Sequence, residues 1–238
     1  LILASILFII AQYFFQLTFS LYDAFLPHVS NKKTVGTISG LGYGLGYIGG
    51  LIAMLLLRPL YVNGYAGELD NLYRLTFPLT ALFFLIFSIP FFIFVKETTI
   101  KKSESILKLA KIGFKNVFNT VKSFKKHKTI FWFLLALYFL DDGLITLFAF
   151  ISIYAINTLA FSIKEISLVY ALIQLLAFPS AIFLGRLSDK KGSKKILLTA
   201  ITIWALVIII LAAATSKTWF YIAAILTSLV IGASQAIP

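Results

Sequence analysis

Seven long apolar runs restrict this chain to a fold that lies within a membrane. Each run is close to the length of about 20 residues that a helix needs to cross about 30 Å of hydrocarbon. Strands of a membrane barrel would alternate polar and apolar residues over about ten positions, and these runs do not alternate. We therefore predict an all-α membrane protein. The runs are Leu1–Tyr22, Val35–Leu57, Leu75–Val95, Ile130–Ile156, Ile166–Leu184, Ile196–Ala214 and Trp219–Ile237.

The composition supports this prediction and excludes several kinds of site. Hydrophobic residues make up 60% of the 238 residues and charged residues only 13%, whereas a soluble domain is about 45–50% apolar. With no cysteine and only two histidines, His28 and His127, disulfides, thiolate sites and a multi-histidine metal site are not expected. We expect no cofactor and no metal. Because the chain begins at Leu1 inside an apolar run, it resembles an internal fragment.

The basic residues indicate the orientation of the spans. The net charge of +12 could suggest a nucleic-acid partner, but 17 of the 21 basic residues lie in the first, third and fifth loops. Basic loops stay in the cytoplasm. The chain therefore starts outside the membrane and ends inside it, and we expect no nucleic acid to bind. The lipid bilayer is its main partner.

The third loop divides the chain into three parts. Residues 1–95 hold three spans, residues 96–128 form a basic linker, and residues 129–238 hold four spans. Apolar residues recur in the linker at helical spacing while lysines occupy other faces, which predicts an amphipathic helix on the inner membrane surface. Calmodulin-type binding is the alternative. The apolar positions are Ile106, Ala110, Phe114, Val117, Val121 and Phe124, and the lysines are Lys108, Lys111, Lys115 and Lys122.

Three carboxylates lie within apolar runs. Asp141 is 11 residues past Ile130, which places it about 16 Å into the membrane. An ionised carboxylate there is costly unless it is protonated, paired or facing water. We expect either Asp141 or Asp142 to face a central cavity, and Gly143 permits a local helix break; a structural hydrogen bond is the alternative. Asp23 lies near the inner end of its span, where a cap or loop contact is an equal alternative.

Neutral polar residues and glycines also follow helical spacing. A polar stripe down a membrane helix lines an aqueous path or bonds to a neighbouring helix, and glycines repeated every four residues allow two helices to approach closely. The candidates for a substrate or proton path are Gln12, Gln16, Tyr43, Tyr47, Tyr170 and Gln174, in addition to Asp23, Asp141 and Asp142. The glycines are Gly36, Gly40 and Gly44 on one face, and Gly42, Gly46 and Gly50 on another.

The fifth loop carries a recognisable motif. It resembles the G-x-x-x-D-[RK]-x-G-[RK]-[RK] signature of the major facilitator superfamily, although Ser193 stands where a basic residue is usual. In that superfamily such loops help to hold one face of the transporter closed, and the aspartate can engage a neighbouring helix N-terminus. The matching residues are Gly185, Asp189, Lys190, Gly192 and Lys194.

Other segments resemble the vacuole effluxer-like branch of that superfamily. These segments are 21–27, 40–50, 138–143 and 232–236, with Asp23 standing where the family often has Asn. By this resemblance the seven runs correspond to spans four to ten of twelve, and the linker joins two six-helix halves. The resemblance implies alternating access with a site near the midplane, in the cell membrane or, in a eukaryote, the vacuolar membrane. It implies a small polar solute, with amino-acid efflux favoured; proton coupling through Asp141 and Asp142 is a hypothesis.

Two rival functions fit the residues less well. A seven-helix receptor would share the orientation, but the dominant inner loop follows the third span and no cysteine pair ties the outer loops. An intramembrane aspartyl protease would use Tyr22-Asp23, but Gly46 is followed by Tyr47 where a second aspartate is needed. We therefore expect no enzymatic activity. No nucleotide-binding loop and no protein partner are indicated.

Overall fold

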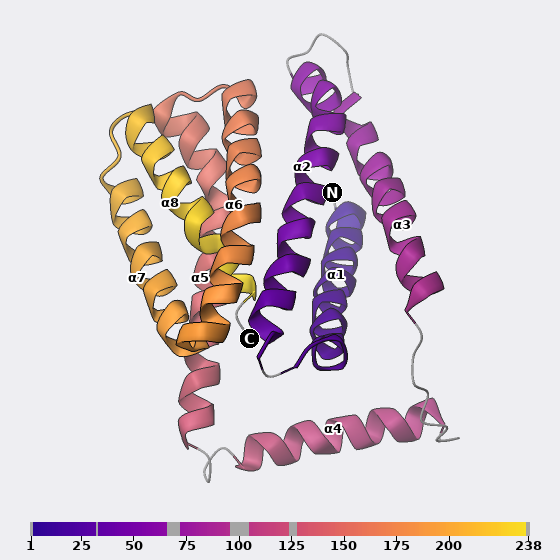
Figure 1. Ribbon diagram of the computed structural model, residues 1–238. Helices are drawn as coiled ribbons and strands as arrows, with labels where there is room; N and C mark the ends of the chain where they lie inside the picture. The colour runs from indigo at the N-terminus through magenta and orange to yellow at the C-terminus, as the bar shows by residue number, and fades with distance from the viewer. Residues whose placement is uncertain (1, 32, 66–71, 96–104, 124–127, 237–238) are drawn as a thin grey trace. The chain divides into compact units, whose positions relative to one another are not determined.

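A computed structural model describes residues 2–31, 33–65, 72–95, 105–123 and 128–236 (Figure 1). Every element in this part of the chain is helical, as the sequence predicts. The elements are α1 (Ile2–Val29), α2 (Val35–Tyr65), the 3-10 helix η1 (Leu72–Leu75), α3 (Thr76–Phe94), α4 (Ile106–Ser123), α5 (Lys128–Leu159), α6 (Ile163–Lys191), α7 (Ser193–Ala212) and α8 (Lys217–Ala236).

The seven predicted spans are confirmed. Within the described residues, 7 helices are long and apolar enough to cross a membrane, and these are all the α-helices except α4. Many of their large apolar side chains are exposed; Phe92 and Phe94, for example, retain 77% and 78% of their accessible surface. Exposed apolar surface of this extent is unfavourable in water and is expected where lipid is the solvent.

The helices extend further than the apolar runs that predicted them. Helix α2 continues past Leu57 to Tyr65, and α6 continues past Leu184 to Lys191. Hydropathy marks where the hydrocarbon ends, whereas the backbone continues its hydrogen-bonded turns until a capping residue or a turn stops it. The helix break that Gly143 would permit is not present, because α5 is continuous through that residue.

The chain separates into two compact units, Leu1–Thr80 with Thr158–Pro238, and Ala81–Asn157. In the first unit, α6 packs along α2 on one side and against α8 on the other, and α7 packs on α8 (Figure 1). Helix α1 contacts α2 over a shorter stretch. The second unit holds α4 together with most of α3 and α5.

Small side chains fill the contacts of α6 with its neighbours. Ala177 and Ala181 of α6 and Ala233 of α8 are completely buried. A methyl group added to Gly232 of α8 would collide with Ala181, so the two backbones lie in direct contact there. Helices in a membrane associate largely through such close packing, since lipid supplies no hydrophobic force between them. Helix α6 thus lies at the centre of the first unit, in contact with α2, α7 and α8.

The linker contains a helix, α4, Ile106–Ser123, at the positions where the sequence predicts an amphipathic helix. The side chain of Phe114 on this helix is 80% exposed. The position of α4 on the inner membrane surface stays a prediction. Phe124, which belongs to the same predicted apolar face, lies outside the described residues, as do 96–104 and 125–127.

Candidate functional site

Asp189 of α6 caps the N-terminus of α2. One carboxylate oxygen accepts a hydrogen bond from the Gly36 backbone N–H (2.8 Å). The other oxygen accepts from both the backbone N–H of Thr37 (2.8 Å) and its hydroxyl (2.7 Å). The first N–H groups of a helix have no partner within the helix and carry a partial positive charge. A carboxylate from a helix more than 150 positions away therefore satisfies them with charge-assisted bonds.

Glycines and small residues make this contact sterically possible. A methyl group at Gly36 would overlap Ser188 and the carbonyl of Gly185, and one at Gly40 would lie 2.5 Å from the carbonyl oxygen of Ala181. At Gly44 the nearest atoms belong to Phe178, at 3.2 Å and beyond. The three glycines thus form the face of α2 that packs on α6.

The loop after Asp189 turns at a glycine that the backbone requires. Gly192 has φ of 90°, a conformation that residues with a Cβ rarely adopt. It lies between the last residue of α6 and the first residue of α7. This turn holds Lys190 and Lys194, the basic positions of the motif, on either side of the glycine.

The three glycines on the other predicted face of α2, Gly42, Gly46 and Gly50, do not share one neighbouring helix. A methyl group at Gly42 would collide with the hydroxyl of Tyr22 in α1, and one at Gly50 would lie 2.5 Å from the side-chain nitrogen of Gln174 in α6. No described atom lies within 4 Å of such a group at Gly46. Gly42 and Gly50 therefore face different helices, although the spacing places them on one side of α2.

A polar contact joins α2, at a buried tyrosine, to α8, at an exposed glutamine. The hydroxyl of Tyr47, whose side chain is 9% exposed, donates a 2.7 Å hydrogen bond to Oε1 of Gln235. On the same length of α2, Gln174 rests against Gly50, and Tyr170 lies one turn away from Gln174 on α6. The structure thus places Gln174 of α6 beside the stretch of α2 that carries Tyr47. The same stretch contacts a residue that the sequence pattern did not indicate.

That residue is Gln235. The sequence signal was present, because Gln235 is a long polar side chain near the end of an apolar span and belongs to the segment 232–236 that carries the family resemblance. A single polar residue at the end of a span gives no spacing pattern. Its partner could be identified only from the packing of α8 on α2.

Asp23 lies at a second contact, between α1 and α2. The hydroxyl of Tyr43 lies 3.4 Å from Oδ1 of Asp23, a long hydrogen bond. The ring of Tyr22 meets the ring of Tyr43 edge-on, with centroids 6.0 Å apart. The glutamines of α1, Gln12 and Gln16, are exposed. The carboxylate of Asp23 on α1 therefore has its hydrogen-bond partner on the next helix, at Tyr43.

Asp141 and Asp142 belong to the second unit. Both side chains are exposed on the continuous helix α5. Their part in a central cavity stays a prediction. Among the residues that the structure describes, no three His, Cys, Asp or Glu side chains lie close enough together to hold a metal ion.

Comparison with known proteins assigns the family. Residues 1–237 match the family described as vacuole effluxer Atg22 like. The chain belongs to the vacuole effluxer Atg22-like family. It is also 27% identical over 220 residues to an uncharacterized MFS-type transporter, YxiO, of Bacillus subtilis (strain 168), an alignment that covers 91% of this chain and 51% of that protein. The chain thus spans about half the length of this relative. No solved structure matches it.

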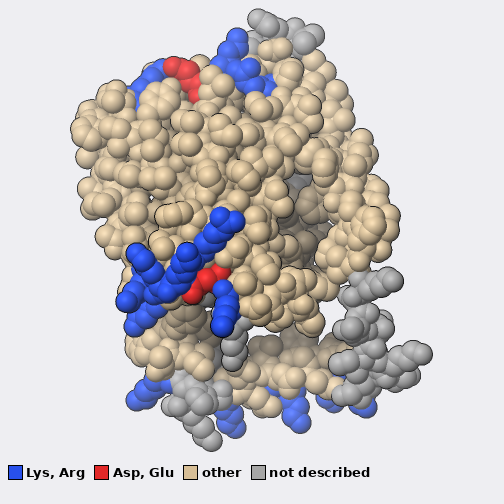
Figure 2. Space-filling model, viewed as in Figure 1, with Lys and Arg blue, Asp and Glu red and all other residues tan. Residues whose placement is uncertain are grey.

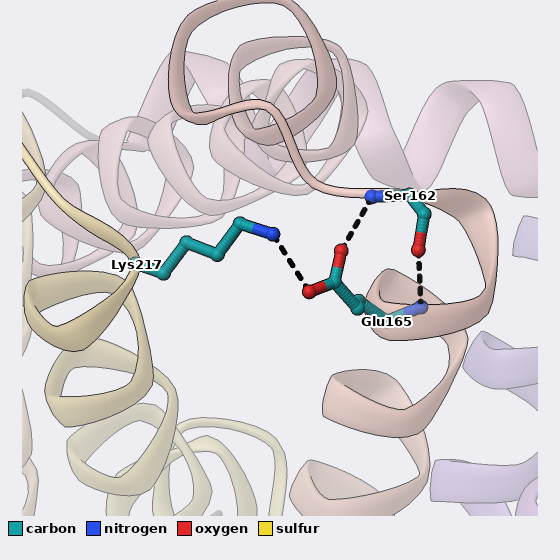
Figure 3. A network of polar contacts seen from close by, with 3 residues as sticks. All are labelled: Ser162, Glu165 and Lys217. Atoms are coloured by element: carbon teal, nitrogen blue, oxygen red, sulfur yellow. Dashed lines mark hydrogen bonds and ion pairs between the residues drawn. The ribbon is translucent and has the colours of Figure 1, made fainter.

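The effluxer-like chain also has a polar network at the opposite end of α6 (Figure 3). Ser162 and Glu165 form a capping box, in which the Ser162 hydroxyl accepts from the Glu165 N–H (3.2 Å) and the Glu165 carboxylate accepts from the Ser162 N–H (2.7 Å). The other carboxylate oxygen of Glu165 pairs with the ammonium group of Lys217 at 2.6 Å. Lys217, the first residue of α8, also lies 4.9 Å from the centre of the Phe161 ring.

This network ties the beginnings of α6 and α8 to each other. The two helices therefore share contacts at their Lys217 end, along their buried alanines, and at the bond from the Ser180 hydroxyl to the Leu229 carbonyl (2.5 Å). Helices α6 and α8 of this family member therefore pack against each other as a pair. The contact of Asp189 with α2 is made by the other end of that pair.

Proposed function

We propose that this chain forms part of a secondary active transporter that moves a small polar solute across the membrane by alternating access. The family membership and the MFS-type relative support this proposal, and they give no support to the receptor and protease alternatives. The observation that carries the proposal is the capping of α2 by Asp189, because it is a polar contact between helices that the proposal assigns to different halves of the transporter.

The halves are part of the proposal. Residues 1–95 supply the last three helices of the first half, 96–128 supply the linker with α4 on the inner surface, and 129–238 supply the first four helices of the second half. On this assignment α2 belongs to one half and α6 to the other. The contact between them at Asp189 lies on the basic, cytoplasmic side.

The cap then serves as a cytoplasmic gate. When the halves approach on the inner side, Asp189 satisfies the free N–H groups of α2; when they separate, water must replace three hydrogen bonds to a carboxylate. Each such bond contributes about 1.5–3 kcal/mol at most. A contribution of this size holds the gate closed and still allows bound solute to shift the equilibrium between the two states.

The polar contact between Tyr47 and Gln235 is the proposed substrate contact. Tyr47 lies about 18 Å along α2 from Val35, near the middle of that span, and transporters of this kind bind their solutes near the midplane. A hydroxyl and an amide offer both donors and acceptors without a fixed charge, which suits a zwitterion such as an amino acid. Gln174 and Tyr170 extend this polar surface along α6. Efflux is the proposed direction, and Asp141 and Asp142 are the proposed proton carriers.

Transport in proteoliposomes tests the proposal. A protein of the relative's length that contains this chain is reconstituted, and uptake of labelled amino acids is measured with and without an inward proton gradient. Tyr47→Phe should reduce uptake at least about tenfold, since it removes the donor to Gln235, and Asp142→Asn should abolish gradient-driven accumulation.

The control is Tyr221→Phe. Tyr221 lies near the start of α8, where its ring packs edge-on against Phe161 at 5.6 Å, and its loss of a hydroxyl should leave uptake unchanged. If a correctly folded protein accumulates no amino acid under any gradient, amino acids are not its substrate. Accumulation that does not depend on the pH gradient would rule out proton coupling.

A further inference from the structure

Helices α6, α7 and α8 line a cavity of about 400 Å³, and none of its lining residues belongs to the proposed solute path. Its body is lined by apolar side chains such as Phe183 and Leu187 of α6, Ile196 and Ile203 of α7, and Leu229 of α8. Phe183 is 64% exposed and Leu229 is 47% exposed, so the cavity opens to the outside of these three helices as a groove.

The groove is apolar along its length and charged at one end. Lys191, the last residue of α6, and Lys195, at the start of α7, both line it. The lining residue furthest from Lys191 on α6 is Ser180, about 16 Å away along the helix axis. That length matches one leaflet of a bilayer whose hydrocarbon is about 30 Å thick.

The lysines at the mouth have no carboxylate partner among the described residues. The one carboxylate of this loop, Asp189, is occupied by the N-terminus of α2. Figure 2 shows the resulting patch, in which blue side chains lie around one red group where α6 ends and α7 begins. The basic residues of the segment are Arg186, Lys190, Lys191, Lys194 and Lys195.

Hydroxyl groups inside the groove are already engaged. Ser180 donates to the carbonyl of Leu229 at 2.5 Å, and Thr199 donates to the carbonyl of Lys195 at 3.0 Å. The body of the groove therefore offers little to a polar solute and favours a hydrocarbon chain. Only the mouth offers charge, and that charge is positive.

We propose that this groove binds an anionic phospholipid of the cytoplasmic leaflet. Its phosphate lies between Lys191 and Lys195, and one acyl chain lies along the apolar wall of α6, α7 and α8. The cytoplasmic leaflet is the one that carries anionic lipid, and the charged mouth lies on the side that the basic loops assign to the cytoplasm. The site is separate from the solute path and does not depend on which solute is carried.

The lipid would act on the turn that carries the gate. Lys191 follows Asp189 by two positions, and Gly192 separates the two helices that form the mouth. A phosphate bound to Lys191 and Lys195 fixes the end of α6 against the start of α7. It also offsets the repulsion among the five basic side chains that surround Asp189.

Lipid binding is measured by native mass spectrometry of the chain in detergent micelles, titrated with phosphatidylglycerol or phosphatidylcholine of identical acyl chains. Wild type should retain phosphatidylglycerol preferentially. The double variant Lys191→Gln/Lys195→Gln should bind it about 30-fold more weakly. The matched control, Lys190→Gln/Lys194→Gln, removes the same charge from the same turn at positions that do not line the groove, and it should bind as wild type does.

Two further binding measurements test whether the groove holds a lipid with its acyl chain or some other ligand. Thr199→Trp fills the groove without changing charge and should weaken phosphatidylglycerol binding, and glycerol phosphate, which has no acyl chain, should not compete. Equal loss in both double variants would show diffuse surface attraction and overturn the proposal. Effective competition by glycerol phosphate, or full binding by Thr199→Trp, would also overturn it, because the groove would then hold no acyl chain.

Discussion

Asp189 is a single side chain that joins two helices far apart in the sequence. Its carboxylate forms three hydrogen bonds, all to the first turn of α2. Two go to backbone N–H groups, so no substitution in α2 can remove them without disturbing the helix itself. Asp189 is therefore the residue at which the contact can be removed cleanly.

We expect Asp189→Ala to open the cytoplasmic side. The variant loses three bonds with a combined value of about 4.5 kcal/mol or more, which changes the ratio of closed to open states by about 1,000-fold or more. The chain contains no native cysteine, so spin labels at Lys33→Cys and Lys190→Cys report a single distance. The variant should shift its distribution to longer values.

A graded variant provides the control. Thr37→Val removes only the hydroxyl bond and keeps both backbone bonds, so it should shift the ratio by only about tenfold. Distance distributions that are identical in wild type and Asp189→Ala would show that the contact does not control opening.

At the scale of the helices, the glycines of α2 offer a matched pair of substitutions. Gly40→Ala places a methyl group 2.5 Å from the Ala181 carbonyl oxygen, whereas Gly46→Ala places one where no described atom lies within 4 Å. The first should destabilise the protein by about 1–3 kcal/mol through overpacking. The second should be neutral or stabilising, since alanine favours a helix over glycine. Unfolding of the purified protein in increasing denaturing detergent measures both, and equal effects would contradict the packing of α2 on α6.

The network at the start of α6 predicts an order of stabilities. Glu165→Ala loses both the capping box and the ion pair with Lys217, whereas Glu165→Gln keeps a side chain that can still complete the box. The unfolding temperature should therefore fall further for Glu165→Ala than for Glu165→Gln. Lys217→Gln removes the ion pair and also the contact of the ammonium group with the Phe161 ring, so it should lower the unfolding temperature somewhat more than Glu165→Gln does. If all three variants melt together, the box contributes nothing.

Spans and contacts differ in how far the sequence predicts them. The seven spans and α4 follow from the sequence because hydropathy and helical spacing are local properties. The partners of Asp189 and Tyr47 lie 153 and 188 positions away, and no local pattern encodes such a pairing. The glycines show the same limit: Gly42 and Gly50 share a spacing, yet one faces Tyr22 and the other faces Gln174.

For the whole molecule, the distribution of charge predicts the orientation in the membrane. Basic residues concentrate in alternate loops, 17 of 21 in the first, third and fifth. The gate at Asp189 and the mouth of the lipid groove both belong to the fifth loop. The capping network at Lys217 belongs to the opposite side. The gate and the lipid site therefore both require the fifth loop to be cytoplasmic.

Single cysteines test that orientation directly. Ser216 lies in the exposed turn between α7 and α8, and Lys194 is exposed in the first turn of α7. In intact cells a membrane-impermeant maleimide should label Ser216→Cys, whereas Lys194→Cys should react only after permeabilisation. The reverse result would mean that the protein has the opposite orientation in the membrane, with the lysine-lined groove in the outer leaflet. Labelling of both positions from outside would mean that α7 does not cross the membrane, and the alternation of charge would then need a different explanation.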